Sequence, residues 1–207
     1  MNVAAALWKS RTASTAAEFG LVVPLLITFL LGTADVGRFL WTCNRAEKAT
    51  QMGARFAIVT DIVPSGLVGY SFATNGGIPQ GDPIPSSLFT SADCVESTGG
   101  TVSCTCVPTA CPGGSAVNTT AFNNIVARMK LFYPAITADN VLINYDYAGL
   151  GYAGDPNGID VAPLVTVKLR NMTFTPMLLR FFGSSSVSLP GFSAALTLED
   201  GSGSVSN

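Results

Sequence analysis

The hydrophobic pattern begins with an uninterrupted apolar run, FGLVVPLLITFLLGTA, at residues 19–34. With Ala16 and Ala17, which precede Glu18, it supplies eighteen uncharged positions. A helix of that length is roughly 27 Å long at about 1.5 Å per residue, close to the roughly 30 Å hydrocarbon core of a bilayer. The pattern therefore predicts a transmembrane helix over residues 14–35, with a kink or local break at Pro24, which lacks a backbone N–H.

The charges that flank this run are asymmetric. Lys9 and Arg11 precede it, and the first acidic residue is Glu18. The positive-inside rule therefore places residues 1–13 in the cytoplasm as a basic leader and the body of the chain on the other side. A buried helix of a soluble domain can have the same length, but the charge asymmetry and the density of Leu, Val and Phe favour a membrane span.

An amphipathic pattern follows over residues 36–62. Apolar side chains recur every three or four positions and cationic ones fall on the other side, which is typical of a half-buried helix. The pattern continues until Pro64, so the two segments would form one helix ~70 Å long whose outer part packs on a globular domain. The apolar positions are Phe39, Leu40, Cys43, Ala46, Ala49, Met52, Gly53, Phe56 and Val59.

A second helix is predicted near residues 120–132. Its cap would be Thr119 or Thr120, and Pro134 would end it. A regular apolar stripe predicts that one face packs in the core. The stripe consists of Phe122, Ile125, Val126, Met129 and Phe132.

The rest of the region 119–200 alternates apolar and polar residues, which predicts strands. The expected fold class is α+β, in which the long N-terminal helix packs on a small antiparallel sheet with the second helix. Residues 201–207, GSGSVSN, are predicted to be a flexible tail. The expected strands cover residues 140–147, 164–170 and 192–199, and a short helical segment is expected within 175–183.

Residues 64–118 form an insert rich in Gly, Pro, Ser and Thr, with little periodicity. Connections of this length are usually functional or held by a covalent link, and we expect the insert to be exposed. Four of the five cysteines lie in it, and an even cluster outside the cytoplasm predicts disulfides. They are Cys94, Cys104, Cys106 and Cys111.

Four cysteines allow three disulfide connectivities. A hairpin turn centred on Gly99 would place Cys94 opposite Cys104, at a separation that a disulfide can span. Cys106 would then pair with Cys111 across a short loop. This local argument favours the pairs Cys94–Cys104 and Cys106–Cys111 over the other two connectivities.

The cysteines also suggest two chemical interpretations. A redox site at Cys104 and Cys106 needs a thiolate beside positive charge, whereas the nearest charged residues are Asp93 and Glu96. A four-cysteine zinc site lacks the paired Cys-x-x-Cys knuckles. The fifth cysteine, Cys43, lies on the apolar helix face, where core packing is the simpler role.

Composition limits the chemistry further. The chain has 207 residues, of which 48 % are apolar and 12 % charged, and it contains no histidine. Histidine-based triads, HExxH zinc sites and histidine-ligated haem are therefore excluded. The net charge of −2 gives no basic excess for nucleic acid. We expect no enzymatic activity, no cofactor, no metal and no nucleic-acid partner.

Glu18 stands at the edge of the predicted membrane segment. Burying a carboxylate at the centre of such a helix costs up to about 3 kcal/mol, so its presence there suggests a function. It either extends to the headgroup boundary or pairs with a positive charge of another chain.

Residues 14–57, STAAEFGLVVPLLITFLLGTADVGRFLWTCNRAEKATQMGARFA, resemble the N-terminus of type IV pilin-like proteins. More specifically, they resemble TadE-like minor pseudopilins of the bacterial tight-adherence (Tad) pilus. The resemblance rests on small residues before Glu-Phe, an apolar helix with an internal proline, and the later Gly-Arg and Gly-Ala-Arg steps. VTVKLRNMTFTPMLL and AALTLED also resemble C-terminal segments of that family.

The resemblance implies cleavage by a prepilin peptidase between Ala13 and Ser14, which leaves Glu18 as the fifth residue, followed by Phe19. Ala13 stands where type IV prepilins usually have Gly. The family glutamate contacts the N-terminal amine of a neighbouring subunit. The implied partners are this peptidase, other pilin or pseudopilin subunits through the N-terminal helix, the pilus platform and inner-membrane lipid.

The resemblance implies a pilin-like assembly subunit that contributes to pilus initiation, tip or priming, and so to surface adhesion. It would be a single-pass inner-membrane protein with a periplasmic C-terminal domain, or a component of the extracellular pilus. Two alternatives stay open. One is an exported binding domain cleaved after Gly32-Thr33-Ala34, and the other is a membrane-anchored thiol-redox protein.

Overall fold

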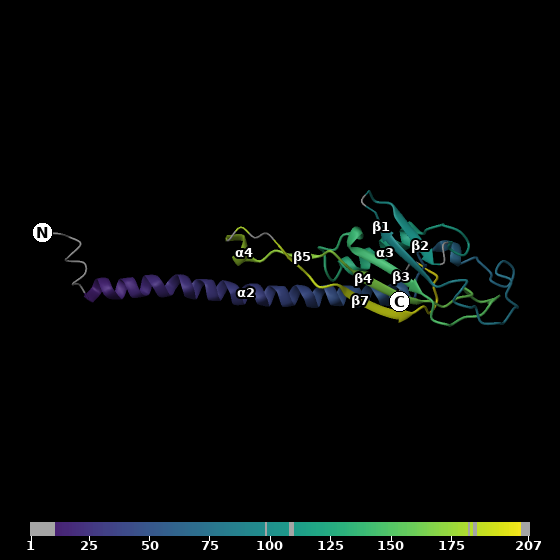
Figure 1. The fold of residues 1–207 in the computed structure, drawn as a ribbon, viewed down its shortest axis with the longest axis horizontal. Coiled ribbons are helices and arrows are strands. Elements are labelled where there is room, and N and C mark those ends of the chain that lie inside the picture. The colour runs from purple at the N-terminus through teal and green to yellow at the C-terminus, as the bar shows by residue number, and fades with distance from the viewer. Residues whose placement is uncertain (1–10, 98, 108–109, 182, 184–185, 204–207) are drawn as a thin grey trace. The chain divides into compact units, whose positions relative to one another are not determined.

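A computed structural model describes residues 11–97, 99–107, 110–181, 183 and 186–203 (Figure 1). Most of the expected leader, residues 1–10, and the end of the expected tail, 204–207, lie outside the described residues. The chain divides into two compact units. The first comprises Met1–Thr42 with Thr173–Ser188, and the second comprises Cys43–Met172 with Leu189–Asn207.

The long helix α2 covers Arg11–Ala57, a span of 47 residues. It is not interrupted at Pro24, so the structure shows no break where the sequence suggested one. A proline lacks only one backbone donor, here the one that would bond to the Gly20 carbonyl, so the other hydrogen bonds of the helix can remain. The helix ends at Ala57, before the predicted boundary at 62, and Ile62 and Val63 are buried in the irregular segment that follows it.

The first unit also contains a small hairpin. Strands β5 (Thr173–Phe174) and β6 (Val187–Ser188) pair in antiparallel fashion. Between them along the chain lies helix α4 (Met177–Phe181), which confirms the short helical segment predicted there.

The second unit is built on a five-stranded antiparallel sheet with the order β2-β1-β3-β4-β7. Its last three strands in this order are those that the alternating pattern predicted, which confirms the α+β fold class. The strands are β1 (Ser91–Glu96), β2 (Val102–Val107), β3 (Val141–Asp146), β4 (Leu164–Leu169) and β7 (Phe192–Thr197).

The hairpin β1–β2 extends this sheet, which differs from the exposed insert that the sequence suggested. Cys94 stands opposite Cys104 on one side and Ile143 of β3 on the other. Cys94 is fully buried, and so are Phe72 and Phe89 in the connection before it. The pairing of β1 with β3 joins segments that are distant in the sequence, so the local pattern of the insert did not predict it.

Helix α3 (Thr119–Lys130) closes one side of the second unit. Its cap is Asn118, whose Oδ1 accepts from the backbone N–H of Ala121 at 3.0 Å, rather than the predicted Thr119 or Thr120. Asparagine is at least as good a cap as threonine, and it stands one residue earlier. The predicted stripe is buried except at its last residue, Phe132.

Two short 3₁₀ helices, η1 (Ser65–Leu67) and η2 (Ala138–Asn140), complete the described elements. The last turns of α2 pack in the second unit through small side chains. Ala46, Ala49, Ala54 and Ala57 have no exposed surface. Gly53 lies so close to Met129 of α3 that a Cβ there would be 2.7 Å from Met129 Cγ.

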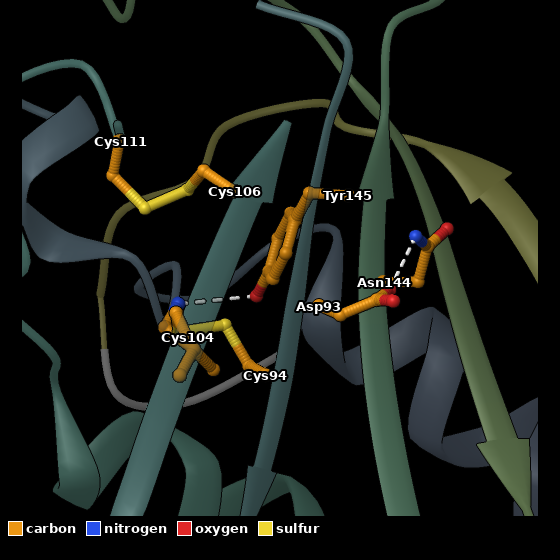
Figure 2. The surroundings of a disulfide bond; sticks show 8 residues. Asp93, Cys94, Cys104, Cys106, Cys111, Asn144 and Tyr145 are labelled. Carbon is orange, nitrogen blue, oxygen red and sulfur yellow. Dashed lines mark hydrogen bonds between the residues drawn. A yellow bond between two sulfur atoms is a disulfide. The ribbon is translucent and has the colours of Figure 1, made fainter. Parts of the chain in front are cut away.

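The second unit contains two disulfides and a buried tyrosine (Figure 2). Cys94 is bonded to Cys104, and Cys106 to Cys111, the same pairs that the local argument favoured. Tyr145 of β3 is fully buried, and its hydroxyl oxygen accepts from the backbone N–H of Val63 at 3.1 Å. Burial raises the pKa of Tyr145 far above its ordinary value.

Candidate functional site

The N-terminal part of α2 exposes almost all of its apolar side chains. The helix is long and apolar enough to cross a membrane, and its most apolar stretch is 6 % buried. A core helix of a soluble domain would instead bury such side chains. The exposed apolar residues here are Phe19, Leu21, Val22, Leu25, Leu26, Ile27, Phe29, Leu30, Val36, Leu40 and Trp41.

The residues implied in processing lie together at the start of this helix. Ala13 and Ser14 fall in its first turn, and Glu18 and Phe19 follow one turn later. Glu18 and Phe19 are exposed. The helix therefore presents a carboxylate directly beside an apolar surface.

Two glycines open the helix surface. Nothing lies within 4 Å of the position that a Cβ would take at Gly20 or at Gly37. Small residues let helix backbones approach closely in a membrane, where the hydrophobic effect does not drive association. The exposed surface of α2 therefore suits helix–helix packing as well as lipid.

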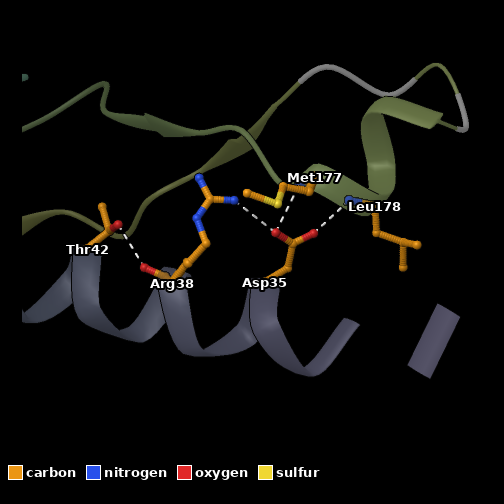
Figure 3. A network of polar contacts seen from close by, with 5 residues as sticks. All are labelled: Asp35, Arg38, Thr42, Met177 and Leu178. Atoms are coloured by element: carbon orange, nitrogen blue, oxygen red, sulfur yellow. Dashed lines mark hydrogen bonds and ion pairs between the residues drawn. The ribbon is translucent and has the colours of Figure 1, made fainter. Parts of the chain in front are cut away.

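Asp35 organises the first unit (Figure 3). Its carboxylate accepts from the backbone N–H of Met177 at 2.9 Å and of Leu178 at 2.7 Å. It also forms an ion pair with Arg38 at 3.1 Å. Asp35 thus takes the place of an N-cap for α4, supplied from another helix, because the first amides of a helix have no partner within it.

Aromatic contacts extend this attachment along α2. Phe39 meets the ring of Phe174 in β5 edge-to-face, with centroids 5.6 Å apart. The guanidinium of Arg38 lies 5.4 Å from the same ring centroid. The sequence analysis missed these roles of Asp35, and the only local signal was Pro176 ahead of a helix without a polar cap.

The structure also bears on the redox and zinc-binding interpretations of the cysteines. Cys104 and Cys106 are each bonded to a different cysteine, so both are oxidised and neither presents a thiolate. Cys43 is the free cysteine and is half-buried. Within the described residues, no group of His, Cys, Asp and Glu side chains is arranged to hold a metal ion.

The acidic loop at residues 155–160, DPNGID, contains a carboxylate with a structural role. Asp160 is buried and accepts from three backbone N–H groups, those of Phe72 at 2.7 Å, Gly154 at 2.9 Å and Asp155 at 3.0 Å. These hydrogen bonds join two loops that are distant in the sequence. The sequence analysis did not predict this role for Asp160.

Comparison with known families gives one result. Residues 13–55 match the family model described as TadE-like protein. The N-terminal segment is TadE-like. The match covers the apolar helix and Asp35 and ends just before the end of α2, so the resemblance stated from the sequence is confirmed there. Searches of the curated proteins and of the solved structures gave no match.

Proposed function

We propose that this protein is a minor pseudopilin, a membrane-anchored assembly subunit of a Tad-type pilus that acts in initiation, tip or priming. The observation that carries the proposal is the exposed apolar surface of α2 within the segment that matches the TadE-like family. Its role is structural rather than catalytic. It contributes to surface adhesion by helping the pilus to form.

In this proposal, each segment of the chain has its own location. Residues 1–13 are the cytoplasmic leader, residues 14–35 cross the inner membrane, and residues 36–62 continue into the periplasm. Residues 64–118 and 119–200 supply the periplasmic domain, and residues 201–207 are its tail. The basic residues before the apolar run support this orientation.

Assembly takes place through the helix. Leaving the bilayer for a bundle of similar stems keeps the apolar side chains covered, and the open surface at Gly20 and Gly37 permits close approach. Glu18 sets the register because a carboxylate in apolar surroundings is strongly stabilised by a positive charge. The N-terminal amine released at Ser14 on a neighbouring subunit is a suitable partner.

The alternatives have less support. A signal peptidase cut before Asp35 would remove about half of the helix that carries the family match, including its apolar run. It would also leave Asp35 at the new terminus, although this residue holds α4 through two hydrogen bonds. A thiol-redox role requires a Cys104–Cys106 couple, whereas the structure bonds both residues elsewhere.

Intact mass and N-terminal sequencing of the protein from its native membrane test the processing step. We expect a chain that starts at Ser14 and is lighter by two hydrogens for each of the two disulfides. A start at Asp35 would overturn the proposed function and identify an exported domain. An uncut Met1 would contradict processing, and Ala13→Gly would then show whether Ala13 blocks it.

Pilus assembly in the host tests the function itself. Deletion of the gene should abolish or strongly reduce pili seen by electron microscopy, and the full chain should restore them. Glu18→Ala should fail to restore them, whereas Glu47→Ala, which changes an exposed acid further along the same helix, should succeed. Normal pili in the deletion strain would contradict the proposal.

A further inference from the structure

We propose that α4 lies in the outer surface of the bilayer that α2 crosses, as an interfacial anchor that fixes the depth of the long helix. The inference rests on the proposed function in one respect, that the apolar run of α2 spans a membrane. It adds a second lipid contact, from a segment far away in the sequence. All of the residues concerned belong to the first unit.

The depth of α4 relative to the bilayer follows from its contacts with α2. The apolar run ends at Ala34, and the next residue, Asp35, holds the first two amides of α4. Leu178 Cδ2 lies 4.0 Å from the position that a Cβ would take at Gly32. The first turn of α4 is therefore beside the last turn of the apolar run. In a spanning helix, that level is the boundary between acyl chains and headgroups.

The composition of α4 suits this boundary. Its sequence, Met-Leu-Leu-Arg-Phe, has four apolar residues and one cation. The Met177 side chain is 48 % exposed, and Arg180 is exposed as well. Helices that lie in the interface insert apolar side chains below the headgroups, while Arg reaches lipid phosphates. An exposed methionine at this position is costly in water but favourable against lipid.

The adjoining turns of α2 extend the same surface. Val36, Leu40 and Trp41 are 60 %, 56 % and 64 % exposed. Trp41 lies six residues beyond Asp35, which is about 9 Å along the helix. Tryptophan concentrates where a membrane meets water, because its ring is apolar and its N–H is polar. Together with α4, these residues form one band at the outer membrane surface.

Spin labels in the full chain test the proposal. The chain is placed in nanodiscs of zwitterionic and anionic phospholipid, one chain per disc, so that no second copy can cover α4. Cys43, the free cysteine, is replaced by alanine, and the other four remain in their disulfides. Labels are introduced by Met177→Cys or Arg180→Cys. Leu25→Cys is the reference for the middle of the span, and Asn123→Cys, at an exposed position of α3, is the reference for water.

Relaxation by oxygen, which dissolves in lipid, is compared with relaxation by a water-soluble nickel chelate. We expect an oxygen-to-nickel ratio at 177 and 180 severalfold above that at 123 and below that at 25. Ratios at 177 and 180 equal to that at 123 would overturn the inference and leave the membrane span intact. A label at 25 that reports water would overturn the span and the inference together. Low access to both reagents at 177 and 180 would indicate cover by protein and also overturn it.

Discussion

Asp35 accepts the backbone N–H of Leu178 at 2.7 Å, across a separation of 143 residues in the sequence. The same carboxylate binds the amide of Met177 and the guanidinium of Arg38. One side chain of α2 therefore provides the cap of a helix near the C-terminus and neutralises a cation on its own face. This contact holds α4 beside the C-terminal end of the apolar run.

Removal of this carboxylate should release α4. Hydrogen bonds to a charged acceptor contribute about 1.5–3 kcal/mol, so Asp35→Ala should speed amide exchange at Met177 and Leu178 by about tenfold or more. Asp35→Asn keeps an acceptor without the charge and should give an intermediate change. Hydrogen exchange measured by mass spectrometry on the full chain resolves this segment.

The control for this experiment is Glu47→Ala. Glu47 is an exposed acid on the same helix, and its Oε1 accepts from Gln51 Nε2 at 3.5 Å. Its removal should leave exchange at α4 unchanged. Equal exchange in the Asp35→Ala variant and the unaltered chain would show that the cap does not hold α4.

Gly53 and Gly37 offer a matched pair of substitutions on α2. A Cβ at Gly53 would stand 2.7 Å from Met129 Cγ and 2.9 Å from its Sδ in a closed core, whereas nothing lies within 4 Å at Gly37. Gly53→Val should therefore destabilise the second unit by about 1–3 kcal/mol through overpacking. Gly37→Ala should be neutral or stabilising by up to about 1 kcal/mol, because alanine favours helix.

Urea unfolding of the detergent-solubilised chain measures both substitutions. If Gly53→Val unfolds at the same urea concentration as the unaltered chain, the close packing of α2 against α3 is not present in solution. If Gly37→Ala is strongly destabilising instead, a partner surface covers Gly37 under these conditions.

Tyr145 should make the second unit sensitive to alkali. Burial raises its pKa in the folded state above the ordinary value of about 10. Above that pH the unfolded chain binds fewer protons than the folded one, so stability falls as pH rises. The slope reaches about 1.4 kcal/mol per pH unit for a single group. Urea midpoints from pH 8 to 11 in the Cys43→Ala background measure it.

Tyr145→Phe should remove this contribution to the alkaline slope. The variant also leaves the Val63 amide without its acceptor, which costs about 1–3 kcal/mol at neutral pH. Tyr147→Phe, which removes a hydroxyl that donates to the Ile84 carbonyl at 2.7 Å, should retain the slope because Tyr145 is still present. An unchanged slope in Tyr145→Phe would contradict the assignment.

The two disulfides should contribute unequally. Cys94 and Cys104 are separated by 10 residues, and Cys106 and Cys111 by 5. On the loop-entropy estimate, closing the longer loop contributes about 3 kcal/mol and closing the shorter one about 2 kcal/mol. Replacing Cys94 and Cys104 together by alanine should lower the urea midpoint more than replacing Cys106 and Cys111. The reverse order would show that loop entropy does not dominate.

The sequence alone determined the elements that have long, regular patterns. The apolar run at 19–34 and its continuation gave α2 because a helical period repeated over many turns leaves few alternatives. The stripe through Phe122 and Met129 gave α3, and the alternation at 141–146 gave a central strand. The order of residues around Glu18 was sufficient to identify the TadE-like segment, which the family comparison confirmed over residues 13–55.

Only the tertiary structure decided the features that depend on distant partners. Strand β1 has six residues and joins the sheet because β3 offers a free edge, which no local pattern reveals. Asp35 became the cap of α4 because two unpaired amides lie within reach of its carboxylate. Local periodicity indicates which face of a helix or strand a residue lies on. The hydrogen-bond partner of a buried polar group depends instead on how segments distant in the sequence pack together.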